Sequence, residues 1–198
     1  IYRLMELPDG RLFGAAGAYE GNFVFDPKTG KAEHLGKIHL SHYATVIHDG
    51  KVYMSGYPTS PLFVYDLSKP WNAGRIGVGK PGVAVPNESD SASNPRMVTR
   101  LHESGAHKMY EGVVGADGRV YFGGRWYRNG SGGGLGWWDT KTGKGGGIWK
   151  PFSNYQVTHL ASASGGQFIV ISTKPVRDAV LDKPTPETGR LFVYDTER

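Results

Sequence analysis

The chain has no cysteine, no long apolar run and no cluster of basic residues, and each absence excludes a class of structure or partner. Without cysteine it forms no disulfide bond and no thiolate metal site. No segment reaches the roughly 18 uninterrupted apolar residues of a membrane helix, so we expect no membrane partner. No segment keeps the 3.6-residue periodicity of an amphipathic helix either. What remains is a fold built from short strands.

Charge argues against a nucleic-acid partner. The 198 residues include 23 Lys plus Arg and 18 Asp plus Glu, which give a formal net charge of +5 with neutral histidine. Nucleic-acid binding normally concentrates such charge in a basic stripe, and the sequence has none. The mild excess better fits an anionic small ligand or polysaccharide, or no specialised charge partner at all.

Turn-forming residues, by contrast, are abundant, with 30 Gly and 12 Pro. A phrase recurs four times among them: Asp-Gly or Gly-Gly, then a β-rich run, then an aromatic run that ends in Asp. The glycine in the second position of each pair is Gly10, Gly50, Gly118 or Gly166, and these glycines are 40, 68 and 48 residues apart. Asp-Gly between alternating runs indicates a hairpin, and periods of roughly 40–50 residues made of short strands are typical of propeller blades. The sequence therefore predicts an all-β fold, a β-propeller of about four blades of antiparallel strands.

The repeats divide the chain, which we interpret as a single propeller unit or propeller fragment over residues 1–198. Their approximate limits are 1–38, 39–101, 102–152 and 153–198. The second repeat contains an insertion at 72–95 that is rich in small, polar and helix-breaking residues. Loops of this length are functional or disordered, so we expect a lid, a partner-binding loop or plain disorder there. An outer strand is expected after it, at 96–101.

Each repeat predicts an inner strand, a second strand, an aromatic third strand and a shorter outer strand. In the second repeat the first three are expected at 43–48, 51–56 and 62–66, and outer strands of the first and third repeats at 32–38 and 147–152. Most of the third-strand aromatic side chains are expected to be buried between blades, since adjacent blades bury both sides of a sheet. The aspartates that end the third strands can accept hydrogen bonds from the backbone amides that follow. We interpret them as structural, namely Asp26, Asp66, Asp139 and Asp195.

Both ends of the sequence favour a larger ring over a closed ring of four blades. The chain starts at Ile1, inside an expected inner strand at 2–7, and the fourth repeat has no residues for an outer strand after its third. A ring has to close to remove its exposed strand edges, and open edges invite aggregation. The expectation is therefore part of a larger ring, with another chain as one partner that could complete it.

Two groups of residues carry a resemblance to known propeller families. Gly123-Gly124, followed by Trp137-Trp138 and Trp149, resembles a kelch repeat. The segments 25–31 and 138–144 resemble the repeats of quinoprotein-like and streptogramin-lyase-like propellers. The resemblance extends over about residues 1–71 and 108–198, and it implies the propeller fold. Such propellers include binding modules, lyases, hydrolases and oxidoreductases, so the resemblance implies no single function.

Candidate site residues follow from aligning the repeats on their glycines. Seven or eight positions before each glycine, where an inner strand should start, the residues are polar or aromatic. Inner strands of a propeller converge on its central channel, so these groups would meet at one mouth, the concave site that a ligand needs. The alternative is that strand starts are polar because water reaches them. The predicted ligand-binding residues are Arg3, His42, Tyr43, Tyr110, Glu111 and His159, with Tyr2 and Thr158 at the two remaining positions.

Two functions remain open. The first is a binding module that holds a small molecule, a glycan or a protein at the channel mouth. The alternative is a carbohydrate-active enzyme, a polysaccharide lyase on an anionic sugar polymer, whose β-elimination needs a base, an acid and a cation for the substrate carboxylate. The residues for these roles would be His42 or His159 as base, Tyr43 or Tyr110 as acid, and Arg125 or Arg3 as the cation. Binding is the first choice, because the sequence has no motif specific to an enzyme.

No cofactor is predicted. The pairs His39 and His42, and His102 and His107, have spacings that could share a divalent metal, but zinc normally needs three or four converging ligands and no helix fixes these side chains. We expect an extracellular or periplasmic location.

Overall fold

The computed structural model describes residues 3–15, 21–36, 38, 41–73, 92–126, 132–176 and 185–198, without the side chains of Ser41 and His42. These residues form strands β1–β15 and three single-turn 3-10 helices, so the all-β class is confirmed. Within the same residues, no helix is long and apolar enough to cross a membrane.

The strands form four antiparallel sheets, each in chain order. Sheet 1 contains β1 (Arg3–Glu6), β2 (Leu12–Ala15), β3 (Asn22–Asp26) and β4 (Lys31–Gly36). Sheet 2 contains β5 (Ser41–His48), β6 (Lys51–Tyr57), β7 (Pro61–Asp66) and β8 (Arg96–Arg100). Sheet 3 contains β9 (Lys108–Val114), β10 (Arg119–Arg125), β11 (Gly133–Asp139) and β12 (Lys144–Ile148). Sheet 4 contains β13 (Tyr155–Ala163), β14 (Phe168–Pro175) and β15 (Leu191–Asp195). The 3-10 helices are η1 (His102–Ser104), η2 (Phe152–Asn154) and η3 (Ser164–Gly166).

The hairpin turns form where the Asp-Gly pairs predict them. Gly10, Gly50 and Gly118 have φ values of 84°, 67° and 78°, in the left-handed region that glycine enters without a steric penalty. The fourth repeat, which has Gly165-Gly166 in place of Asp-Gly, turns through η3 instead, with both glycines at positive φ. Four hairpins therefore set the order of inner and second strands.

The four aspartates that end the third strands are structural, as predicted. Each carboxylate accepts a hydrogen bond from the backbone N–H two residues later, at 2.8 Å for Asp26, 3.0 Å for Asp66, 2.9 Å for Asp139 and 3.1 Å for Asp195. Hydrogen bonds from the residues that follow hold the pKa of Asp26, Asp66 and Asp139 below its ordinary value. The carboxylates thereby close the turn at the end of each third strand.

One outer strand lies elsewhere than predicted. The expected strand at 147–152 is wrong: β12 starts at Lys144 and ends at Ile148, and Phe152 begins η2. The sequence is misleading because β12 contains three glycines, which suggest a turn. In the structure these glycines make room for neighbours, since a Cβ on Gly146 would lie 2.5 Å from the Trp137 ring and a Cβ on Gly147 would lie 2.1 Å from the Ser104 amide.

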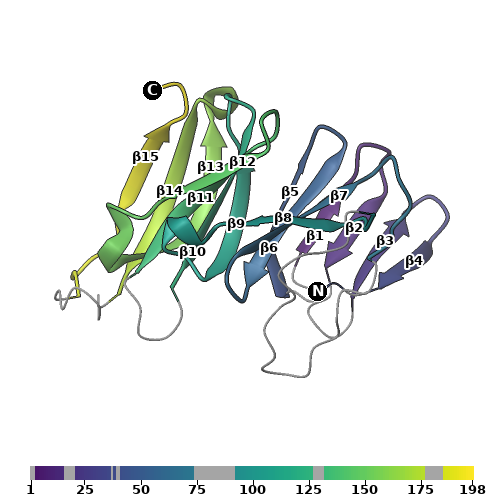
Figure 1. Ribbon diagram of the computed structural model, residues 1–198, viewed down its shortest axis with the longest axis horizontal. Coiled ribbons are helices and arrows are strands. Elements are labelled where there is room, and N and C mark those ends of the chain that lie inside the picture. The colour runs from purple at the N-terminus through teal and green to yellow at the C-terminus, as the bar shows by residue number, and fades with distance from the viewer. Residues whose placement is uncertain are drawn as a thin grey trace.

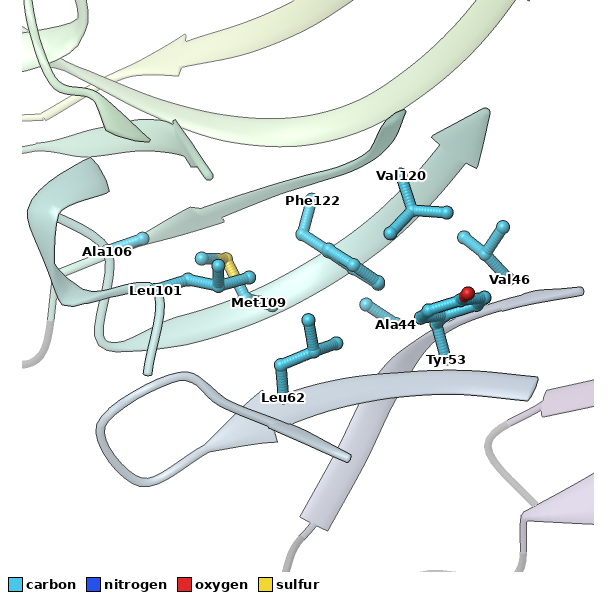
Figure 2. Close-up of a cluster of buried hydrophobic side chains, with 9 residues drawn as sticks. All are labelled: Ala44, Val46, Tyr53, Leu62, Leu101, Ala106, Met109, Val120 and Phe122. Carbon is cyan, nitrogen blue, oxygen red and sulfur yellow. The ribbon is translucent and has the colours of Figure 1, made fainter. Parts of the chain in front are cut away.

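The core lies between the sheets rather than within one of them. Figure 2 shows the cluster between sheets 2 and 3, where Tyr53 and Leu62 point toward Met109, Val120 and Phe122. A second cluster joins sheets 1 and 2, and a third joins sheets 3 and 4. Each of the two middle sheets therefore buries both of its faces.

The third-strand aromatic residues are less buried than predicted. Phe63 and Tyr65, on β7 between sheets 1 and 2, are buried. The other five are half-buried, namely Phe23, Phe25, Trp138, Phe192 and Tyr194. Strand pairing places Phe23 and Phe25 on the face of sheet 1 that points away from sheet 2, and no sheet covers that face in the described part of the chain.

The sheets follow one another in space as they do in sequence. Inner strand β1 contacts β5, β5 contacts β9 and β9 contacts β13. Strands β4 and β15 lie at opposite ends of the long axis (Figure 1). The described sheets do not close on themselves, so the structure shows four antiparallel sheets in a row and not the complete ring of a propeller.

The base of the predicted insertion at 72–95 is held in place, while its residues 74–91 lie outside the described part of the chain. The backbones of Asn72 and Asn94 exchange two hydrogen bonds, at 2.5 and 2.6 Å. The Asn94 amide also donates to the carbonyl of Asp66 at 3.0 Å and accepts from its backbone N–H at 2.8 Å. The insertion thus starts and ends beside the last residue of β7, directly before β8.

Candidate functional site

Three inner strands share a local irregularity near their first residues. In β5 the register with β6 shifts between His42 and Ala44, which places Tyr43 at a β-bulge. In β9 the bulged residue is Tyr110, and in β13 it is Thr158. Such β-bulges turn a side chain away from the regular alternation of the strand and are frequent beside functional sites.

Five of the six predicted ligand-binding residues line one pocket. It is open to solvent, has a volume of about 340 Å³ and is bounded by Arg3, Tyr43, Tyr110, Glu111, Gln156, Thr158 and His159. These residues come from the inner strands of all four sheets, which the chain order places side by side. Of the sixth, His42, the structure describes only the backbone, which pairs with Gly56, and Tyr2 lies outside the described residues.

Two larger hollows lie away from the inner strands. One of about 700 Å³ is lined by exposed turn residues such as Lys69 and Lys141, and one of about 440 Å³ lies beside Trp71. Neither combines side chains from more than two neighbouring sheets. We therefore take the inner-strand pocket as the candidate site.

Arg3 joins three of the four sheets at this pocket. Its Nε donates to the carbonyl of Tyr43 at 2.8 Å, and its Nη2 donates to the carbonyl of Tyr110 at 3.0 Å and to the Glu111 carboxylate. Both carbonyls belong to residues at β-bulges, where the register of the sheet shifts. The planar guanidinium is suited to this task because its donors diverge in fixed directions. Arg3 therefore links β1, β5 and β9 by hydrogen bonds, and the Glu111 carboxylate compensates its charge.

A second cation lies against the two tyrosine rings of the pocket. The Lys108 ammonium is 4.0 Å from the centroid of the Tyr43 ring and 5.3 Å from that of Tyr110, a cation–π geometry. The ring centroids are 6.3 Å apart, with a tilt of 55° between the rings. The ammonium thus contacts the tyrosine rings that line the pocket.

Arg125, predicted as a possible cation for a substrate carboxylate, lies near the Tyr110 ring. Its guanidinium carbon is 5.7 Å from the Tyr110 ring centroid, and its Nε is buried without a hydrogen-bond partner. Burying an unsatisfied donor costs about 1–3 kcal/mol. With Lys108, Arg125 and the Arg3–Glu111 pair, the surroundings of the pocket carry a positive excess.

Tyr110, His159 and Thr158 bring further polar groups to the pocket. Burial raises the pKa of Tyr110, and the nearby Arg125 only partly opposes this, so the phenol keeps its proton at neutral pH. His159 is exposed on the pocket wall. The Thr158 hydroxyl donates to the carbonyl of Ser172 at 3.0 Å, which fixes the bulged residue beside it. The pocket therefore combines a protonated phenol, an exposed imidazole and a fixed hydroxyl.

The remaining histidines do not gather into a metal site within the described residues. His107 lies between Tyr57 and Trp126, at ring distances of 5.4 and 6.1 Å, and burial lowers its pKa. His102 is exposed on η1, and His39 lies outside the described residues. In the part of the chain that the structure describes, no group of three or more His, Asp or Glu side chains could hold a metal ion.

Sequence reasoning missed Gln156, which lines the pocket, and Lys108, which lies against its tyrosine rings. Both stand two positions before a bulged residue, Tyr110 or Thr158, and residues at i and i+2 share a face of a regular strand. Strand alternation could thus have indicated them. The bulges themselves have no sequence signal that we recognise.

Comparison with known proteins identifies no family. No protein-family model matches the chain, and no curated protein sequence matches it. One solved structure that resembles it is the extracellular domain of BT4673 from B. thetaiotaomicron, a protein assigned to hybrid two-component systems, with 16% sequence identity and a TM-score of 0.42. The match covers 99% of this chain and 26% of that one, so the chain spans about a quarter of its length. A likeness at this level carries no argument about ligands or partners.

Proposed function

We propose that the chain is part of a β-propeller-type binding module, and that the inner-strand pocket binds an anionic carbohydrate. The proposal rests on one observation above all: side chains from four inner strands, far apart in sequence, line a single pocket. Its volume of about 340 Å³ lies at the lower end of the roughly 300–1,000 Å³ of small-molecule sites, which suits one or two sugar rings.

The chemistry of the walls supports a sugar acid over a neutral sugar. Lys108 lies against the Tyr43 and Tyr110 rings and Arg125 lies near the Tyr110 ring, whereas Glu111 is paired with Arg3. Charge-assisted hydrogen bonds to a carboxylate are roughly twice as strong as neutral ones. The Tyr43 and Tyr110 side chains add apolar ring surface and hydroxyl donors, which suit a pyranose ring. Such a ligand agrees with the extracellular or periplasmic location that we propose.

Binding is tested by calorimetry with oligogalacturonate and with its neutral counterpart, an oligogalactoside. Lys108→Met removes the charge while keeping the length of the side chain, so we expect at least about tenfold weaker binding of the acidic sugar and a weaker dependence on salt. Lys141→Met, in an exposed turn away from the pocket, is the matched control and should bind like the unaltered protein. Equal affinity for both sugars, or an equal effect of both variants, would contradict the proposal.

A polysaccharide lyase is the second candidate, because an exposed histidine and a protonated tyrosine share the pocket. His159 would take the proton next to the substrate carboxylate, and Tyr110 would protonate the leaving oxygen. Such a reaction leaves an unsaturated sugar that absorbs in the ultraviolet. Polygalacturonate, alginate and hyaluronan should then give rising absorbance that His159→Ala abolishes. No rise with any of the three leaves binding as the function of the pocket.

A further inference from the structure

Trp126 exposes an apolar ring in the middle of the row of sheets. In the described part of the chain, four large apolar side chains are exposed, and the other three lie on β1 and β15, in the two end sheets. Trp126 directly follows β10 in sheet 3, which has a covering sheet on each face, and it is 42% exposed. Its exposure therefore does not arise from the uncovered faces of the end sheets.

Trp126 is the exposed member of a row of three rings. Its ring centroid lies 6.1 Å from that of His107, which lies 5.4 Å from the Tyr57 ring in an edge-to-face arrangement. Tyr57 and His107 are half-buried, and burial lowers the pKa of His107, so its imidazole is mostly neutral at pH 7. The row is thus an uncharged aromatic surface, of the kind that is enriched where proteins bind partners.

Hydrogen bonds hold the backbone beneath these rings. The Trp126 N–H donates to the Gly132 carbonyl at 2.7 Å, and the His107 N–H donates to the Arg125 carbonyl at 2.8 Å. Both bonds lie directly beside the pairing of Arg125 with Lys108 in the β9–β10 ladder. Because this backbone is fixed in advance, a ligand that packs on the Trp126 ring loses little binding free energy to ordering the protein.

The row of rings lies at the same end of sheets 2 and 3 as the inner-strand pocket. Tyr57 is the last residue of β6, and its partner on β5 stands two residues before Tyr43, or roughly 7 Å along the strand. His107 directly precedes Lys108, whose ammonium lies over the Tyr43 ring. A ligand bound in the pocket therefore reaches the Trp126 ring only by extending beyond the pocket.

We propose that this row of rings is a second subsite of the pocket, and that the ligand is consequently a chain of sugars rather than a single acidic sugar. The inference rests on the function proposed above. One sugar occupies the pocket with its carboxylate toward Lys108, and a following sugar packs the apolar C–H face of its pyranose ring on Trp126. The second contact depends on apolar area and not on charge. The pocket thus selects acidic sugars, and the row of rings selects chain length.

The first test is calorimetry with galacturonate and with its oligomers of increasing length. The affinity of the unaltered protein should rise from the monomer to the longer oligomers. Trp126→Ala should weaken binding of the longest oligomer about tenfold and leave that of the monomer unchanged. Trp126→Tyr keeps an aromatic ring and should retain most of the length dependence. Leu191→Ala, which removes an exposed apolar side chain on β15, is the matched control and should bind like the unaltered protein.

The dependence of binding on salt separates the subsite from the pocket. Lys108→Met should weaken binding at every length and reduce the salt dependence, whereas Trp126→Ala should leave the salt dependence unchanged, because the ring carries no charge. Circular dichroism checks that each variant is folded. Equal affinity for all lengths, or an equal loss of monomer and oligomer binding in Trp126→Ala, overturns the subsite and leaves the pocket as proposed. If galacturonate binds at no length, both proposals are wrong.

Discussion

Replacing Phe63 with alanine should cost about 3–5 kcal/mol of the free energy of unfolding. Phe63 is 1% exposed, and its ring lies in the cluster between sheets 1 and 2 with Phe13, Val24 and Met54. Its backbone pairs with β6 on one side and with β8 on the other, so the sheet cannot collapse into the space that the ring leaves. We therefore expect the upper half of that range, a large part of the roughly 5–15 kcal/mol that stabilises a domain.

Urea denaturation followed by the fluorescence of the chain's five tryptophans measures this loss. Leu67→Ala is the matched control, because Leu67 packs against the same cluster but is only half-buried, and it should cost about 1 kcal/mol. A loss below about 1 kcal/mol for Phe63→Ala would mean that the two sheets do not pack through this ring. The packing of sheet 1 on sheet 2, and the row of sheets built on it, would then be wrong.

Two further predictions concern the surroundings of the pocket. Gly124→Ala should destabilise the fold by about 1–3 kcal/mol in the same denaturation assay, because the added Cβ would lie 2.2 Å from the Lys108 carbonyl oxygen. Gly145→Ala is the control and should cost less, because its added Cβ would lie no closer than 3.3 Å to another atom. Burial lowers the pKa of His107 from its ordinary 6.5, so the unfolded chain binds the proton more readily than the folded one. Stability from the neutral imidazole is therefore present above about pH 6.5 and lost as the pH falls through that value toward the folded pKa, and His107→Gln should remove this part of the pH dependence of the melting temperature.

The parts of the fold that the sequence predicts are those with local causes. An Asp-Gly pair needs only its own backbone to turn, and the Asp26 carboxylate closes its turn with an amide two residues away. The hairpins and the ends of the third strands were therefore predictable residue by residue. The spacing of these signals also predicts that the inner strands start at equivalent places, which is why Tyr43, Tyr110 and His159 could be named together before their pocket was seen.

The parts that the sequence does not predict depend on contacts between sheets. The glycines of β12 read as a turn, because only the structure shows Trp137 and the Ser104 backbone pressed against them. The half-buried state of Phe25 depends likewise on which face of sheet 1 has a neighbour. The alternation of residues along a strand shows which side chains share a face, but it does not show which other sheet covers that face.

Arg3 lies at the predicted site but has a different role from the one that the sequence predicts. The sequence offers it as a cation for a substrate carboxylate, whereas the structure shows its donors directed at the carbonyls of Tyr43 and Tyr110 and at Glu111. Those carbonyls need a donor because the bulges that turn the two tyrosines into the pocket also take their backbones out of the ladder. The hydrogen bonds of Arg3 and the two bulges therefore depend on each other. Without Arg3 the carbonyls of Tyr43 and Tyr110 lose a hydrogen-bond donor, and without the bulges the two rings would not line the pocket. Arg3 is consequently engaged by the protein itself, and the proposed ligand contacts should be tested first at Lys108, which lies against both tyrosine rings.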